Sequence, residues 1–225
     1  MNLACEAPAL SRSALPPPSL AHCDALEDLT RIFEERIRIA VLERPACPQI
    51  VDYLDGLAAQ GTLRSGLRCA VDAGDTLSLN AWDAHPGREV LKDDVRFLVE
   101  LYCELMGCAR AGVRLEVLDK AMCPRLHVDR TGIRLLCTYR GPGTEWLDER
   151  HADRRFLGAA AQGLADEASG LITAAQAIHS VPPFAVALLK GESWQGNAGH
   201  GLIHRSPAVK PEAMPRVVLS LDAIW

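Results

Sequence analysis

The first half of the chain carries apolar residues at helical spacing. A proline-led segment at about 48–60 and a longer one at about 89–106 each place their apolar side chains on one face, as amphipathic helices do. Pro48 suits the first turn of the shorter helix, because a proline there loses no helical hydrogen bond. Apolar and charged residues alternate over 37–41, which predicts a half-buried strand. We therefore expect mainly helices, with one or two strands, over residues 24–112.

The pattern changes to short strands beyond Gly112. Alternating residues divided by turn residues predict strands at 113–117, 124–129, 133–139, 184–189, 201–205 and 216–221. An alanine-rich segment at about 150–180 interrupts them and predicts a helical insertion. Helices followed by many strands are typical of an α+β domain. We expect a barrel-like or jelly-roll sheet over 113–225, covered by the N-terminal helices, with 24–225 forming a single domain.

Residues 1–23 differ in composition from the rest of the chain. They are rich in alanine, proline and serine, and three prolines follow one another at 16–18. Such a composition favours an extended, mobile chain over a packed element. We expect a flexible arm.

Composition and charge limit the partners that the protein could have. The 225 residues are 48% hydrophobic and 24% charged, with a formal net charge of −5. The 24 Lys and Arg residues are scattered, so no cluster could neutralise many phosphates, and we expect no nucleic-acid partner. No apolar run reaches the ~20 residues of a membrane helix, and no signal-peptide pattern is present. We expect a cytoplasmic protein without a membrane partner, in which the eight cysteines are reduced.

Three His-x-Asp pairs occur in the chain, and their surroundings distinguish them. The pair that begins at His22 ends the predicted arm, where its aspartate could cap a helix, and the pair at His151 lies in a charge-dense, solvated segment. His127 and Asp129 instead lie on a predicted strand. Residues two apart on a strand point to the same face, about 6.6 Å from each other. Both side chains could therefore reach one metal ion.

A third ligand is available in the segment GLIHRSP, where His204 lies on another predicted strand. Two histidines and one carboxylate form the facial triad, which leaves open positions on an iron(II) ion. Arg216 then begins the last predicted strand, on the same face as Val218 and Ser220. A guanidinium that points into a barrel requires an anion, and its planar fork suits a carboxylate.

The order His-x-Asp, distal histidine, then arginine resembles the iron(II)- and 2-oxoglutarate-dependent oxygenases, over roughly residues 113–225. The segments LLCTYRGPGTEWL, FAVALLKGES, HRSP and PRVVLSL support the resemblance. It implies a double-stranded β-helix (jelly-roll or cupin-like) core in the C-terminal half and oxidation of a small-molecule or protein substrate. The sequence departs from the pattern at Val218, where many relatives have a serine or threonine that helps to hold the cosubstrate.

The same resemblance implies a role for particular residues. Iron would be held by His127, Asp129 and His204, and Arg216 would bind the distal carboxylate of 2-oxoglutarate. Tyr139 would add a hydrogen bond to the cosubstrate.

Cys123 leaves a second interpretation open. A thiolate beside two imidazoles and a carboxylate would favour zinc over iron. A straight strand places this thiol about 13 Å from His127, so it could join only if the chain bends at Pro124. The whole chain also resembles an uncharacterised bacterial family of unknown function, some members of which are encoded near zinc-responsive genes. The alternative is therefore a non-catalytic or hydrolytic zinc-binding protein of the same fold, with a role in metal homeostasis.

Two further histidines are weaker candidates. His200 lies in the glycine-rich loop ESWQGNAGHG, where it could close over a substrate or face water. His179 precedes two prolines and is more typical of a turn than of a metal ligand.

Overall fold

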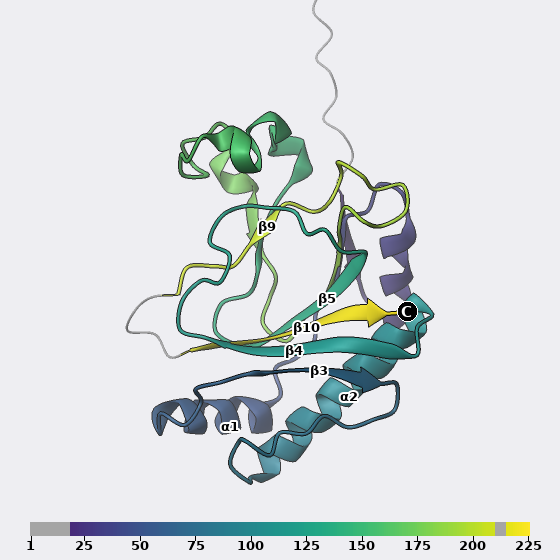
Figure 1. Ribbon diagram of the computed structural model, residues 1–225, viewed down its shortest axis with the longest axis vertical. Coiled ribbons are helices and arrows are strands. Elements are labelled where there is room, and N and C mark those ends of the chain that lie inside the picture. Colours follow the sequence, from purple (N-terminus) through teal and green to yellow (C-terminus); the bar gives the residue numbers. More distant parts are fainter. Residues whose placement is uncertain (1–18, 210–214) are drawn as a thin grey trace, which may run out of the picture.

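The computed structural model describes residues 19–209 and 215–225 of the chain (Figure 1). Its largest element is a seven-stranded sheet in the order β1-β2-β8-β5-β10-β4-β3. Strands β1 and β2 pair in parallel, and the other neighbours are antiparallel. The bounds are β1 Leu20–Cys23, β2 Ile39–Leu42, β3 Leu67–Asp72, β4 Arg110–Leu118, β5 Ile133–Arg140, β8 Val186–Lys190 and β10 Arg216–Ile224.

A three-stranded sheet in the order β7-β6-β9 lies over part of one face of the large sheet. Its strands are β6 Glu145–Leu147, β7 Ile178–Ser180 and β9 His204–Arg205. Trp146 of β6 packs with Ile39 and Val41 of β2 and with Ala187 and Leu189 of β8, so the two sheets share a small apolar core. The result is a mixed fold of helices and strands in which sheet dominates.

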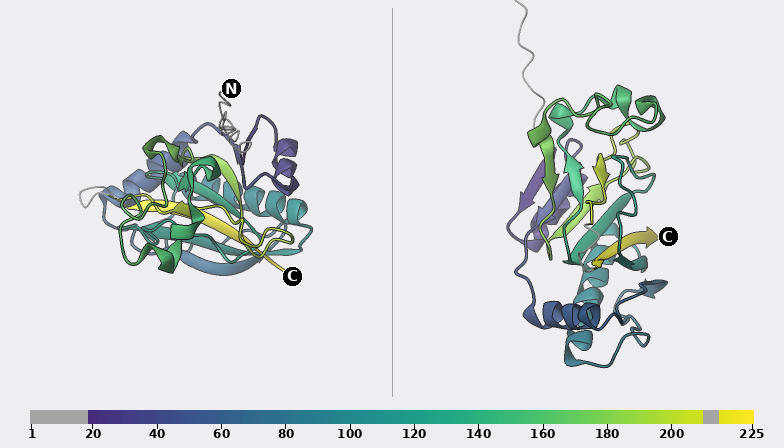
Figure 2. Two further views of the ribbon diagram at one scale, coloured as in Figure 1. Left: turned by 90° about the horizontal axis from the view of Figure 1, so that it is seen from above. Right: turned by 90° about the vertical axis from the view of Figure 1, so that its left-hand side faces the viewer.

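Helices α1 (Pro48–Ala59) and α2 (Pro86–Met106) cover the other face of the large sheet (Figures 1 and 2). The main hydrophobic core lies between them and the sheet. Both helices begin at a proline, and α2 ends at Gly107, whose φ of 67° closes the helix in the left-handed conformation. Neither α-helix combines the length and apolar character that a membrane span requires.

The alternation of side chains decides which residues face which layer. In β10, Val217, Leu219 and Leu221 belong to the core under the helices. Arg216 and Ser220, which have the opposite parity, line a cavity on the other face. The large sheet therefore separates an apolar core from a polar cavity.

Most predicted elements are present, with shifted ends. The two helices and the strands at 113–117, 133–139 and 216–221 match α1, α2, β4, β5 and β10. The predicted strand at 37–41 exists as β2, but all of its residues are buried because sheet and helices cover it on both faces. No pattern in the sequence indicated β3.

The predicted arm is wrong in its last residues. Residues 20–23 form β1 and pair with β2 from Leu20↔Ile39 to Cys23↔Leu42. The rest of the predicted arm, 1–18, lies outside the described residues.

The predicted strand at 124–129 is also wrong. Only one bridge forms there, between His127 and His204. Pro124 has no N–H to give to a ladder, and the N–H of Leu126 donates to the side chain of Asp166 instead. The segment is therefore a loop that touches β9 at one point.

The predicted helical insertion at about 150–180 consists of short 3₁₀ turns. They are η2 Glu149–His151, η3 Arg154–Phe156, η4 Gly158–Ala161 and η5 Ala175–Ala177, while a further 3₁₀ helix, η1, spans Leu26–Phe33. Gly158, Gly163 and Gly170 have φ angles of 65°, 80° and 88°. Each of these left-handed positions turns the chain and prevents an α-helix from continuing. The turns gather at the end of the molecule away from α1 and α2 (Figure 2).

Candidate metal centre

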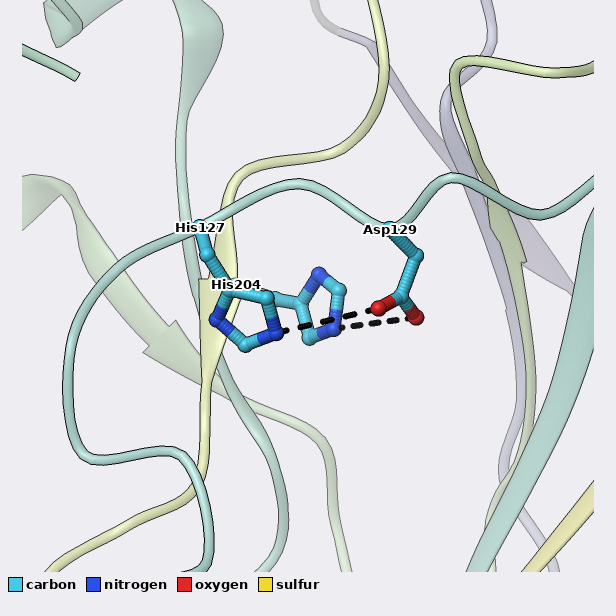
Figure 3. A group of neighbouring side chains, drawn as sticks. All are labelled: His127, Asp129 and His204. Carbon is cyan, nitrogen blue, oxygen red and sulfur yellow. Dashed lines mark ion pairs between the residues drawn. The ribbon is translucent and has the colours of Figure 1, made fainter. Parts of the chain in front are cut away.

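Three side chains from distant segments converge between the two sheets (Figure 3). His127, Asp129 and His204 each offer a ligand atom, and these atoms lie within 4.8 Å of one another. His127 Nε2 lies 3.7 Å from Asp129 Oδ1, and His204 Nε2 lies 3.5 Å from Asp129 Oδ2. The structure thus brings together the three residues that the sequence singled out.

A main-chain bridge holds the two histidines side by side. The N–H of His127 donates to the carbonyl of His204 at 3.0 Å, and the N–H of His204 donates back at 2.9 Å. Their ring centroids are 4.6 Å apart. Paired residues in a bridge carry their side chains on the same side, so one short bridge is enough to place both rings. Asp129 then enters from the loop two residues further along.

Hydrogen bonds fix the orientation of both rings. His127 Nδ1 lies 2.9 Å from the carbonyl oxygen of Arg125, and His204 Nδ1 lies 3.1 Å from that of Leu202. A carbonyl can only accept, so each Nδ1 carries the proton in these bonds. The lone pair of each neutral ring is therefore at Nε2, which faces the centre of the group. This is the arrangement by which metal-binding histidines are usually oriented.

The electrostatics lower the pKa values of Asp129 and His127. Burial alone would raise the pKa of Asp129, but the hydrogen bond from His204 and the charges of His204 and Arg134 lower it to about 2. Burial, followed by the nearby His204, lowers the pKa of His127. A carboxylate and an unprotonated imidazole are the forms that bind metal ions, so the donor set fits a divalent cation.

Arg134 stabilises the carboxylate of Asp129. Its Nη1 contacts Asp129 Oδ2, while Nε and Nη2 bind the two oxygens of Asp222 at 2.9 and 3.0 Å. The guanidinium therefore links Asp129 to the last strand of the sheet.

A buried aspartate in the insertion supports both histidine segments. Asp166, which is 3% exposed, accepts bonds from Arg125 Nε at 2.8 Å, the Leu126 N–H at 2.7 Å and Arg205 Nη1 at 3.2 Å. Leu126 precedes His127, and Arg205 follows His204. The sequence contains no signal for this contact, because Asp166 is a single acidic residue in an alanine-rich segment.

The three converging side chains open onto a cavity of about 340 Å³ that also contains Arg216. Arg216 is 2% exposed and donates to the Pro142 carbonyl at 2.7 Å and to the hydroxyls of Thr138 and Thr144 at 3.1 and 3.0 Å. Burial lowers its pKa to about 10. No carboxylate pairs with this guanidinium among the described residues. A buried cation without an acidic partner is costly, so the position favours binding of an anion.

The predicted role of Tyr139 is wrong. Its side chain lies with Ile133, Leu135 and Cys137 as predicted, but that face of β5 is the core under the helices. The Tyr139 hydroxyl is 2.6 Å from Asp94 Oδ2, and Arg44 holds the same carboxylate. Burial raises the pKa of Tyr139 well above its usual value. The neighbour of Arg216 on β5 is Thr138, on the opposite face.

The other candidates lie apart from the three converging residues. Cys123 is exposed and lines the same cavity, but its thiol is not part of the group of ligand atoms. His200 lines a different cavity, of about 510 Å³, next to Arg38. His179 stacks on Trp146 with ring centroids 4.7 Å apart. Within the described residues, no second group of three or more His, Cys, Asp or Glu side chains converges in this way.

Comparison with known proteins places the chain in a family. Residues 23–222 match the model of DUF1826, described as a protein of unknown function. The chain belongs to the DUF1826 family. A search of curated proteins gave no match to this DUF1826 protein.

Solved structures give remote likenesses to this DUF1826 protein. A rice dioxygenase for auxin oxidation has 16% identity and a TM-score of 0.46, covering 91% of this chain and 82% of that one. A dioxygenase for auxin oxidation from Arabidopsis thaliana, in complex with 2-oxoglutarate, has 10% identity and a TM-score of 0.49, covering 91% of both chains. A Pseudomonas putida prolyl-4-hydroxylase has 13% identity and a TM-score of 0.42, covering 88% and 98%. At TM-scores below 0.5, these likenesses assign no role to any residue.

Proposed function

We propose that the protein is an iron(II)- and 2-oxoglutarate-dependent oxygenase that acts on a substrate yet to be identified. The observation that supports this most directly is the shared cavity. It holds two imidazoles and a carboxylate in position to bind a metal ion, and it also holds Arg216, a buried guanidinium without a carboxylate partner among the described residues. A metal site alone would not require the second feature.

His127, Asp129 and His204 would hold the iron. The bonds from their Nδ1 atoms to main-chain carbonyls orient the two rings, and Arg134 orients the carboxylate. Three ligands of this kind leave positions open on the ion. Iron(II) with 2-oxoglutarate would supply the activation of O₂, while the protein supplies binding and orientation.

Arg216 would bind the distal carboxylate of 2-oxoglutarate. Its guanidinium is held from the sides by Pro142, Thr138 and Thr144, so little side-chain entropy is lost on binding. Val218 lines the cavity where many oxygenases have a hydroxyl. The hydroxyl of Thr144, which lines the cavity and contacts Arg216, could take that place.

The fold that we propose for this centre is the double-stranded β-helix. The small sheet lies over the large one, and the group of ligand atoms lies between β9 and the loop after β4. Two facing sheets with ligands between them support this assignment. In contrast to the expectation from sequence, N-terminal strands β1, β2 and β3 extend the large sheet beyond the C-terminal half.

A zinc-binding protein is the competing function. Two histidines and one carboxylate also form a zinc site with an open position, and a thiol, Cys123, lines the same cavity. Such a protein would need the same three ligands but would have no use for an anion at Arg216. Binding of 2-oxoglutarate therefore separates the two functions.

The test is an anaerobic titration of the metal-free protein with iron(II), with and without 2-oxoglutarate. We expect one equivalent of iron to bind and a weak visible charge-transfer band to appear only when 2-oxoglutarate is added. The Arg216→Gln protein should bind iron but show no band at the same concentration. If iron or zinc binds while 2-oxoglutarate does not bind at millimolar concentration, the zinc-binding function replaces the oxygenase. If no metal ion binds, both functions are wrong.

A further inference from the structure

Two arginines face each other on the wall of the cavity. Arg68 on β3 and Arg114 on β4 are direct partners in the antiparallel register, and both side chains line the cavity. Like charges at directly opposed positions destabilise a sheet. Arg68 Nε binds Glu116 Oε1 at 2.8 Å, so its charge is paired, whereas Arg114 Nη2 binds Asp222 Oδ2, a carboxylate that it shares with Arg134.

Asp222 carries one negative charge but contacts two guanidinium groups. Its two oxygens accept from Arg134 at 2.9 and 3.0 Å, and one of them also accepts from Arg114. The other carboxylate that Arg134 contacts is Asp129, whose charge would be used by the metal ion. Two guanidinium groups therefore share one available carboxylate.

The arginines around the cavity outnumber the carboxylates. Four arginines line it, namely Arg68, Arg114, Arg134 and Arg216, and the carboxylates that line or back it are Glu116, Asp129 and Asp222. A divalent metal ion and dianionic 2-oxoglutarate would cancel each other. One positive charge then remains, shared by Arg114 and Arg134, which both contact Asp222.

Donors are also available there. The hydrogen bonds of Arg114 use Nε and Nη2, and the contacts of Arg68 with Glu116 use the same two nitrogens. The Nη1 group of each arginine has no partner among the described residues. The side chain of Arg68 is 66% exposed and that of Arg114 33% exposed, so a ligand can reach both.

From this arrangement, and resting on the proposed oxygenase function, we infer that the substrate carries an oxyanion, a carboxylate or a phosphate ester. Arg68 and Arg114 would bind this group through their Nη1 atoms, as paired guanidinium groups commonly bind such anions. Met122 and Leu136, which also line the cavity, would contact the apolar part of the substrate. Binding of this anionic group by the two arginines would fix the position of the substrate. It would thus determine which substrate atom faces the metal ligands.

The test follows the arginine Nε–H resonances of the ¹⁵N-labelled protein by NMR, assigned through the variants Arg68→Gln and Arg114→Gln. The protein is loaded with zinc(II) and 2-oxoglutarate and is then titrated with acetate, methyl phosphate or neutral acetamide. We expect both anions, but not acetamide, to shift the Arg68 and Arg114 signals. Arg110, on the same strand but paired with Asp72 outside the cavity, is the internal control.

Loss of one arginine should weaken anion binding at the other. A hydrogen bond to a charged group corresponds to about ten- to hundredfold in affinity, so Arg114→Gln should shift the anion titration of Arg68 by that factor. Arg68→Gln lies on an exposed edge strand and serves as the milder variant if Arg114→Gln is unstable. The inference is wrong if acetamide acts like the anions, or if Arg68 and Arg114 respond no more than Arg110 does.

A final arm separates this inference from the proposed function. The same titration is repeated, without metal and 2-oxoglutarate, on the Asp129→Asn, Arg216→Gln double variant, in which Arg68, Arg114 and Arg134 still exceed Glu116 and Asp222 by one charge. An anion response at Arg68 and Arg114 in this variant supports the second anion site even if the wild type fails to bind 2-oxoglutarate. Loss of the response with Arg216 would mean that one anion site serves both, and would overturn the inference.

Discussion

The main-chain N–H of Leu126 donates a 2.7 Å hydrogen bond to Oδ2 of Asp166, forty residues away. The same oxygen accepts a bond from Arg205 at 3.2 Å. These donors belong to the residues next to His127 and His204. The insertion therefore ties together the two segments that bring the imidazoles into one place.

Removal of this carboxylate should loosen the centre. We expect Asp166→Ala to weaken metal binding about tenfold or more, because residues that support metal ligands typically contribute ten- to hundredfold. Asp166→Asn keeps an acceptor and should have a smaller effect. Metal affinity would be measured by competition with a chelator. Asp153→Asn, in the same insertion, alters a carboxylate that binds Arg155 and its N–H, and this variant should bind metal normally. Wild-type affinity in a folded Asp166→Ala protein would contradict this role.

The three proposed ligands should each be required for metal binding. Exchange of His127, Asp129 or His204 for alanine should abolish stoichiometric binding of iron(II) or zinc(II), because two remaining side chains cannot hold the ion alone. Metal content after dialysis would be measured by elemental analysis. The variants His22→Ala and His151→Ala alter the other two His-x-Asp pairs and should bind one equivalent. Full binding by His127→Ala and His204→Ala would show that the ion lies elsewhere.

The sequence predicted part of the candidate site because that part has a local signal. Alternation placed Arg216 and Ser220 on one face of β10, and the structure agrees. The proximity of His127 and Asp129 was also correct, although for the wrong reason, since they lie in a loop and not on a strand. A spacing of two residues brings side chains together in several extended conformations.

The sequence could not show which face of a strand meets the helices, or which distant residues contact each other. Tyr139 was placed correctly with Ile133 and Leu135, but the pattern does not say which face of β5 meets the helices. The pairing of β10 with β5, which sets Thr138 beside Val218, is a long-range register with no local signature. The contact between Asp166 and Leu126 is of the same kind. Such contacts depend on how the whole chain folds.

Cys123 should have little effect on metal binding. Its thiol lines the cavity but lies outside the group of ligand atoms, so Cys123→Ser should leave zinc affinity within about twofold of wild type, below the roughly tenfold cost of losing one charged contact. Cobalt(II) in the wild-type protein should show no sulfur-to-metal charge-transfer absorption. A strong cobalt–thiolate band that Cys123→Ser removes would instead support the zinc-binding function.

Lys190 should give the protein a distinctive alkaline pH dependence. It is 2% exposed, and burial, followed by the charge of Arg38, lowers its pKa to about 8. The unfolded chain keeps this proton up to about pH 10.4, so between these values the unfolded state binds more protons than the folded state. The contribution of Lys190 to stability should therefore increase as pH rises from 8 to 10.

The measurement is the difference in free energy of unfolding between wild type and Lys190→Met at several pH values. We expect the free energy of unfolding of wild type, relative to that of the variant, to increase from pH 8 to 10. The difference should be constant from pH 6 to 7. Lys120→Met, at an exposed position, should show no such trend. A difference that stays flat up to pH 10 would mean that Lys190 titrates normally.

Arg216 distinguishes a cosubstrate-binding enzyme from a protein that only binds metal. Truncation of one partner of a buried, hydrogen-bonded charge pair costs about 2–5 kcal/mol, which is roughly thirty- to several-thousandfold in affinity. Arg216→Gln should weaken 2-oxoglutarate binding by a factor in that range and leave metal affinity nearly unchanged. Arg216→Lys should be intermediate, because an ammonium keeps the charge but not the planar fork. Calorimetry measures metal affinity on the metal-free protein and 2-oxoglutarate affinity on the manganese-loaded protein.

Two comparisons make the result specific to the cavity face. Thr144→Val removes a hydroxyl beside Arg216 and should weaken 2-oxoglutarate binding several-fold, since one hydrogen bond is worth about 1 kcal/mol. Tyr139→Phe removes a hydroxyl on the opposite face of β5 and should lower thermal stability, because the Asp94 carboxylate loses a partner, but should leave 2-oxoglutarate binding unchanged. A structural Arg216 would behave like Tyr139, because its loss would lower the unfolding temperature without changing cosubstrate affinity. The opposite pattern, with affinity lost and stability kept, is the one expected for a guanidinium that has no acidic partner among the described residues until 2-oxoglutarate binds.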